Sequence, residues 1–146
     1  MRDTNAKLPD TMFWHRYNGR FSGLPTWPGF DAFWRRFEAS GGDWYVFDPA
    51  RDAPGAPHPD IASALAEARA CVEQARSRGF CGAVFADDLE APDFVKVFDP
   101  DQMGGVCGGS RERVLPKWIF SRIAPDPLPL IPAAPAKKGL FARLTG

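Results

Sequence analysis

The stretch from Pro59 to Asp88 constrains the fold of this chain most, because it predicts a helix, a glycine stop and a buried strand in direct succession. Its apolar residues recur at spacings of four, three, four and three, the period of one helical face: Ile61, Leu65, Ala68, Val72 and Ala75. Asp60 is placed to cap the start of the helix, and Gly79 follows the last periodic residue. The run from 81 to 86 is short, apolar and bounded by aspartates, as expected for a strand. The centre of the chain therefore predicts a helix beside a sheet.

Other segments also carry the periodicity of secondary structure. A second helix is predicted by aromatic residues at positions i, i+3, i+4 and i+7, namely Phe30, Phe33, Trp34 and Phe37. Three further strands are predicted at 44–47, 94–98 and 117–123. The fold class is therefore α+β, with a small, mainly antiparallel sheet of about four strands and two helices on one face. Parallel pairing of the two strands that flank the main helix is an alternative that the sequence leaves open.

Length and composition are those of one soluble domain. The chain has 146 residues, of which 45% are hydrophobic and 25% charged. Eighteen basic and eighteen acidic residues cancel, so no overall field attracts nucleic acid or an anionic membrane. The first ten residues carry no apolar run, no stretch has the length of a membrane span, and three cysteines form no paired spacing. We therefore expect a cytoplasmic protein.

The C-terminal segment differs from the rest of the chain. Five of the eleven residues from 125 to 135 are proline, which favours an extended linker outside the sheet. A short basic and apolar peptide follows, in which Leu140, Phe141 and Leu144 share one face if it becomes helical. We expect this peptide to dock on a protein partner; peripheral contact with a membrane surface is a weaker alternative. The predicted organisation is a frayed N-terminus at 1–10, a globular domain at 11–124 and a linker with a docking peptide at 125–146.

The segment from 11 to 28 is aromatic but lacks clean periodicity, and glycines and prolines interrupt it. We expect an irregular arm across the domain, with room for one short helical turn or strand. Trp14, Tyr17 and Trp27 are predicted partner-binding residues, because Trp, Tyr and Arg are the preferred anchors of protein interfaces. Binding of single-stranded nucleic acid would use the same residue types, but the absence of net charge makes it the weaker hypothesis.

A glycine-rich loop supports an alternative function. Successive backbone N–H groups in such a loop can bind an anion, and neighbouring arginines can add charge. The candidate anion-binding residues are Cys107, Gly108, Gly109, Arg111 and Arg113. The spacing of Cys107 and Arg113 is that of a phosphatase-type thiolate loop, but the residues after Arg113 predict a strand and not the required helix. A small phosphate-ligand-binding protein or enzyme is therefore the alternative, and a plain connecting loop explains the glycines more simply.

Residues for catalysis or metal binding are sparse. The chain has two histidines, and its three cysteines are separated by ten and twenty-six residues without a Cys-x-x-Cys motif. No Ser-His or Cys-His arrangement can be argued, so we predict no catalytic residue, no metal ligand and no cofactor. The preferred interpretation is a non-catalytic accessory or adaptor protein. It would bind a larger protein or assembly through the aromatic N-terminal arm and the C-terminal tail.

Overall fold

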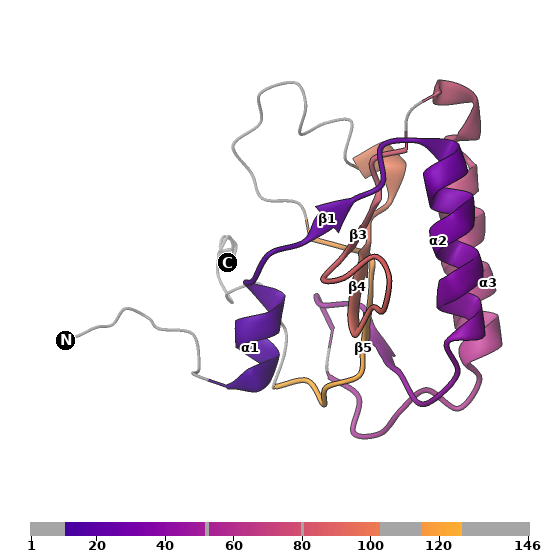
Figure 1. Cartoon of the computed structure of the whole chain (residues 1–146). Helices are drawn as coiled ribbons and strands as arrows, with labels where there is room; N and C mark the ends of the chain where they lie inside the picture. Colours follow the sequence, from indigo (N-terminus) through magenta and orange to yellow (C-terminus); the bar gives the residue numbers. More distant parts are fainter. Residues whose placement is uncertain (1–10, 52, 80, 103–114, 127–146) are drawn as a thin grey trace, which may run out of the picture.

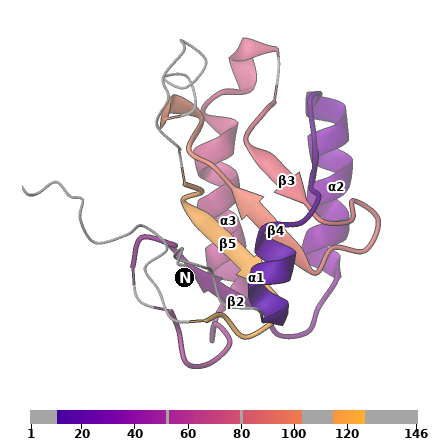
Figure 2. The same ribbon diagram turned by 90° about the vertical axis from the view of Figure 1, so that its left-hand side faces the viewer.

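Five short strands pair into one antiparallel sheet in the order β1-β3-β4-β5-β2. The structure is a computed structural model that describes residues 11–51, 53–79, 81–102 and 115–126. Helices α2 and α3 cover one face of this sheet, and the short helix α1 lies on the other (Figures 1 and 2). The elements in chain order are α1 (Met12–Tyr17), β1 (Ser22–Gly23), α2 (Trp27–Ala39), β2 (Tyr45–Phe47), α3 (Ile61–Glu73), β3 (Val84–Ala86), β4 (Phe94–Val97) and β5 (Trp118–Ser121).

The mixed α and β class is confirmed, and several details differ from the expectation. The described sheet has five strands and not four, because β1 pairs with β3 at one edge. Every pairing is antiparallel, so the alternative with a parallel pair is wrong. The strand expected at 81–86 is limited to β3, and those expected at 94–98 and 117–123 are shortened to β4 and β5. No helix among the described residues is long and apolar enough to cross a membrane.

The prediction of an irregular arm at 11–28 is wrong. Thr11 caps α1 by accepting the N–H of Trp14 on its hydroxyl oxygen at 3.3 Å, and Thr26 caps α2 in the same way with Gly29 at 3.1 Å. Pro28 lies in the first turn of α2, where a backbone N–H would have no hydrogen-bond acceptor within the helix, so proline is tolerated there. Pro28, one of the prolines expected to interrupt this segment, therefore lies within the first turn of a helix.

Helix α3 and its ends follow the predicted signals. The Asp60 carboxylate accepts the N–H of Ser63 at 3.2 Å, which confirms the cap. A 3-10 turn (Arg76–Arg78) follows α3 and ends at Gly79, whose φ of 73° is the left-handed conformation that favours glycine. Arg76 joins α3 to α2, because its guanidinium binds Asp31 at 2.8 and 3.1 Å and also lies 4.5 Å from the centre of the Trp27 ring.

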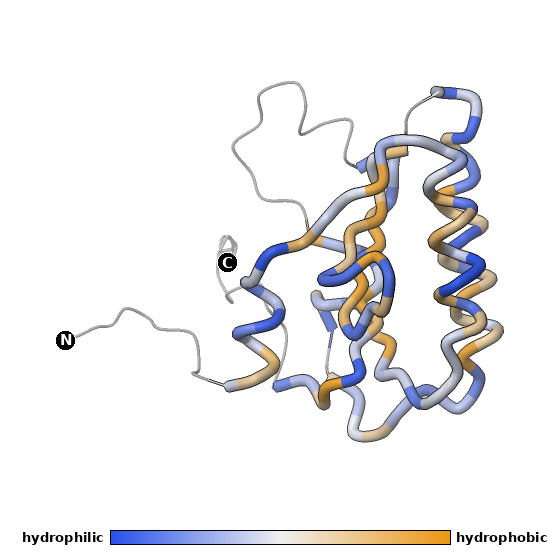
Figure 3. The backbone as a smooth tube through the Cα atoms, viewed as in Figure 1, coloured by the Kyte–Doolittle hydropathy of each residue, from blue (hydrophilic) through white to orange (hydrophobic). Residues whose placement is uncertain are grey.

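The main core lies between the sheet and the pair α2 and α3. The four aromatic residues predicted on one face of α2 are all buried: Phe30, Phe33, Trp34 and Phe37. The ring of Phe37 packs edge-on against Trp44 and Phe120 at centroid distances of 5.3 and 5.1 Å. Hydrophobic residues run along the central strands between the two helical layers (Figure 3). This aromatic layer fixes the position of α3 relative to the sheet.

A second, smaller core lies under α1. Strand β4 alternates, so that Val95 and Val97 face α2 and α3 while Phe94 and Lys96 face α1. Phe13 of α1 packs on Phe94 at 5.5 Å between ring centres. Both faces of the sheet are therefore partly covered by helices.

Candidate functional site

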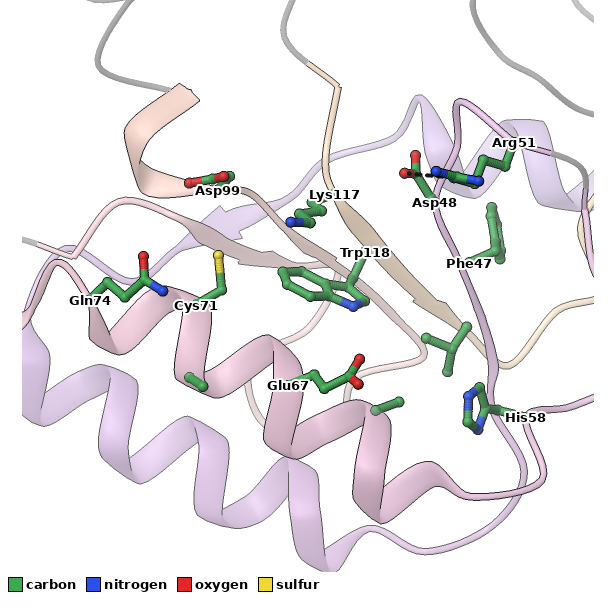
Figure 4. Close-up of a pocket in the computed structure, with 13 residues that line it drawn as sticks. Phe47, Asp48, Arg51, His58, Glu67, Cys71, Gln74, Asp99, Lys117 and Trp118 are labelled. Atoms are coloured by element: carbon green, nitrogen blue, oxygen red, sulfur yellow. Dashed lines mark ion pairs between the residues drawn. The ribbon is translucent and has the colours of Figure 1, made fainter.

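A groove of about 720 Å³ runs between α3 and the part of the sheet formed by β2 and the start of β5 (Figure 4). Four segments build it: one face of α3, the residues of β2 with the turn and loop that follow, Asp99 after β4, and the residues at the start of β5. The lining residues are Val46, Phe47, Asp48, Arg51, His58, Ala64, Glu67, Ala70, Cys71, Gln74, Asp99, Lys117 and Trp118. Pockets of this size commonly hold small molecules.

The groove exists because small side chains of α3 face a large side chain of β5. Trp118 is the register partner of Val97, so its side chain lies on the helical side of the sheet. Opposite it, α3 contributes Ala64, Ala70 and Cys71, which cannot fill the space over an indole. The Trp118 ring is half-buried and projects between Cys71 and Glu67 (Figure 4). An aromatic surface is therefore left accessible inside the groove.

Charged groups of both signs line the groove. Asp48 and Arg51 form an ion pair at 3.7 Å at one end. The Lys117 ammonium lies 5.2 Å from the centre of the Trp118 ring. Among the described residues, Glu67 and Asp99 form no ion pair, and the Asp99 carboxylate accepts only the backbone N–H of Asp101, at 3.0 Å. Two carboxylates are therefore available to a ligand that can donate hydrogen bonds.

The groove holds a thiol and an imidazole, but neither is activated. Burial raises the pKa of the Cys71 thiol, and the nearby Asp99 carboxylate raises it further, so Cys71 is protonated at neutral pH. His58 accepts the N–H of Asp60 on Nδ1 at 2.9 Å, which leaves the proton of the neutral ring on Nε2. Among the described residues, no group of three or more His, Cys, Asp or Glu side chains could hold a metal ion. The described lining can bind a ligand but offers no ready nucleophile.

The predicted partner-binding residues of the N-terminal segment lie inside the fold. Trp14 and Trp27 are each 7% exposed, and Tyr17 is half-buried with its ring 6.1 Å from that of Phe94. Trp14 packs under α1, and Trp27 packs against Phe30. Only the exposed edges of these rings are within reach of another molecule, and their role in partner binding stays a prediction.

Two sets of predicted residues lie outside the described part of the chain. One is the docking peptide with Leu140, Phe141 and Leu144; the other is the anion-binding set Cys107, Gly108, Gly109, Arg111 and Arg113. The flanks of both segments are described. Asp99 and Lys117, on either side of segment 103–114, both line the groove. Asp126, which precedes segment 127–146, accepts a hydrogen bond from the hydroxyl of Thr11.

Sequence reasoning missed the groove. It predicted a strand around Trp118 and assigned no binding role to Asp99, Cys71 or Trp118. One signal was present: Glu67, Cys71 and Gln74 recur at helical spacing and make a polar stripe beside the apolar face of α3. Such a stripe normally faces solvent, so it identifies a site only once the opposite wall is known.

No family model, curated protein or solved structure matches the chain. Function is therefore argued from the residues themselves.

Proposed function

We propose that this chain is a non-catalytic accessory protein that binds a larger protein or assembly through its C-terminal segment and the adjoining end of α1. One contact supports the proposal above all: the hydroxyl of Thr11 donates a hydrogen bond to the carboxylate of Asp126. Asp126, the last described residue and the second of the segment predicted to dock on a partner, therefore lies beside the first residues of α1. The two regions named from sequence, the arm and the tail, begin at the same place.

The exposed surface at this place suits a protein contact. Met12 is 66% exposed and is the one large hydrophobic side chain that stands exposed among the described residues. It lies on the first turn of α1, next to Thr11. Methionine is a flexible, polarizable side chain that adapts well to a partner's surface. A partner that contacts the domain around Asp126 would find Met12 exposed beside it.

Helix α1 would act as a fixed support in this arrangement. Its buried residues Phe13 and Trp14 anchor it to the sheet, and Arg16 pairs with Asp87 at 2.7 Å. We propose that the protein acts in the cytoplasm, because the two described cysteines are free thiols.

Partner capture by the tagged full-length chain, measured by quantitative mass spectrometry after crosslinking, tests this function. Ending the chain after Asp126 should abolish capture while the circular dichroism spectrum keeps its folded form. Met12→Asp should weaken capture, whereas Ala66→Asp, which adds the same charge on an exposed position of α3, should not. Capture that survives the truncation unchanged would refute the role of the C-terminal segment.

A small phosphate-ligand-binding protein or enzyme using segment 103–113 is the second candidate. The observation that favours it is that Asp99 and Lys117, described residues on either side of that segment, both line the groove. A ligand that binds only the folded form raises its melting temperature. Phosphate, sulfate or nucleotides should therefore stabilise the chain, and Cys107→Ser should reduce the shift. An unchanged melting temperature with every anion tested would refute this second candidate function.

A further inference from the structure

We propose that the groove between α3 and β5 binds a planar heterocycle with N–H donors on its edge, of the class of a nucleobase or nucleoside, stacked on Trp118. The site uses described residues only and is separate from the contact surface proposed for the accessory function. It also needs no residue of segment 103–114.

The Trp118 indole is the main reason for a planar ligand. Part of this large ring is accessible in the groove, and three of the side chains that α3 contributes to the lining are small: Ala64, Ala70 and Cys71. A core ring such as Phe37 has aromatic side chains packed on it, whereas Trp118 packs against the main core and stays partly exposed. A flat ring inserted beside Trp118 would gain the same stacking contact that aromatic side chains offer to bases.

The walls of the groove select the polar groups of that ligand. The Glu67 carboxylate lies beside the ring of Trp118, and Asp99 lies on the opposite wall above Cys71 (Figure 4). Ionised carboxylates only accept hydrogen bonds, so they favour a ligand edge that donates. Gln74 lies further along the same face of α3 and can both donate and accept. Guanine provides such an edge with an amino group beside a ring N–H, and adenine and cytosine each provide an amino group.

The charge balance argues against a highly anionic ligand in the groove. Three carboxylates line it, from Asp48, Glu67 and Asp99, against the cations Arg51 and Lys117. Arg51 is already paired with Asp48. A neutral base therefore fits the lining better than a free polyphosphate, and Lys117 can at most balance one negative charge. We expect guanosine to bind best, because its adjacent N–H groups can meet one carboxylate with two hydrogen bonds.

Isothermal titration of the full-length chain with guanosine, adenosine, cytidine and uridine tests the proposal. Guanosine should bind more tightly than uridine, whose edge is dominated by acceptors. Trp118→Ala should weaken guanosine binding about 5- to 150-fold, the range found when a stacking side chain is removed. Trp118→Phe should retain most of the affinity, and it keeps the test valid if the alanine variant does not fold.

Two carboxylate variants complete the design. Glu67→Gln should weaken guanosine binding, while Glu90→Gln, an equally exposed carboxylate after β3 and outside the groove, should leave it unchanged. Neither variant should alter partner capture, so failure here is distinguishable from failure of the accessory function. The absence of heat and of chemical-shift change with all four nucleosides at millimolar concentration would overturn the proposal. Binding that is equally tight in Trp118→Ala would overturn it as well.

Discussion

Replacing Lys96 by methionine should remove a rise in stability that the native chain shows between about pH 8 and pH 10.5. The side chain of Lys96 lies under α1, where its ammonium donates to the backbone carbonyl of Tyr17 at 2.7 Å. It also lies 4.0 Å from the ring centre of Tyr17 and 4.1 Å from that of Phe21. Methionine keeps most of the apolar stem and removes the charge.

The magnitude follows from the ionisation of Lys96. Burial lowers its pKa from 10.5 to about 8. Between these two values the unfolded chain holds a proton that the folded chain has released, so the free energy of unfolding rises with pH. A full shift corresponds to about 3.4 kcal/mol, and because Lys96 is only half-buried we expect about 2 kcal/mol. Below pH 8 both states are protonated, and the difference between the two proteins should be constant.

Urea unfolding followed by tryptophan fluorescence at pH 7, 8, 9 and 10, under reducing conditions, measures this difference. Titrating groups shared by the two proteins, such as the thiols, cancel when the Lys96→Met values are subtracted from those of the native chain. Lys117→Met is the matched control, because it removes an exposed lysine in the same way. A difference between native chain and Lys96→Met that stays flat from pH 7 to pH 10 would show that the Lys96 amine is not desolvated by α1.

Three further outcomes follow from the described contacts. Phe37→Ala should lower the free energy of unfolding by about 3–5 kcal/mol, measured by urea titration, since it empties the centre of the aromatic core. Hydrogen bonding to Arg76 lowers the pKa of Asp31, so the folded chain should lose stability as the pH drops through this lowered pKa. Melting curves recorded from pH 5 to pH 2 should show a smaller loss of stability in Asp31→Asn than in the native chain. Gly42→Ala should lower the melting temperature, because φ is 75° at Gly42 and the new Cβ would lie 2.5 Å from the guanidinium of Arg122. Gly55→Ala should not lower it, because the space around Gly55 is open. An equal loss at both glycines would contradict this explanation.

Parts of the candidate sites differ in how far the sequence could predict them. The C-terminal segment is recognisable because proline restricts the backbone locally, whatever the rest of the chain does. The aromatic residues Trp14 and Trp27 were assigned to a surface, yet the same apolar character places them in the core. Residue type alone does not separate an interface from an interior, since both favour large rings. The groove could not be predicted at all, because Trp118 and the side chains of α3 that line the groove with it are more than forty residues apart along the chain.

The sequence by itself determined the position of α2, α3 and most strands, because apolar periodicity, the Asp60 cap and the glycine stop at Gly79 act over a few neighbouring residues. Tertiary structure alone decided that β1 joins the sheet, that Trp118 stands opposite the small residues of α3, and that Thr11 meets Asp126. These contacts join residues far apart along the chain, and their formation depends on how the helices pack on the sheet. A local sequence pattern carries no information about which distant residue will be in contact. The groove, and the contact between Thr11 and Asp126, are therefore seen only in the folded chain.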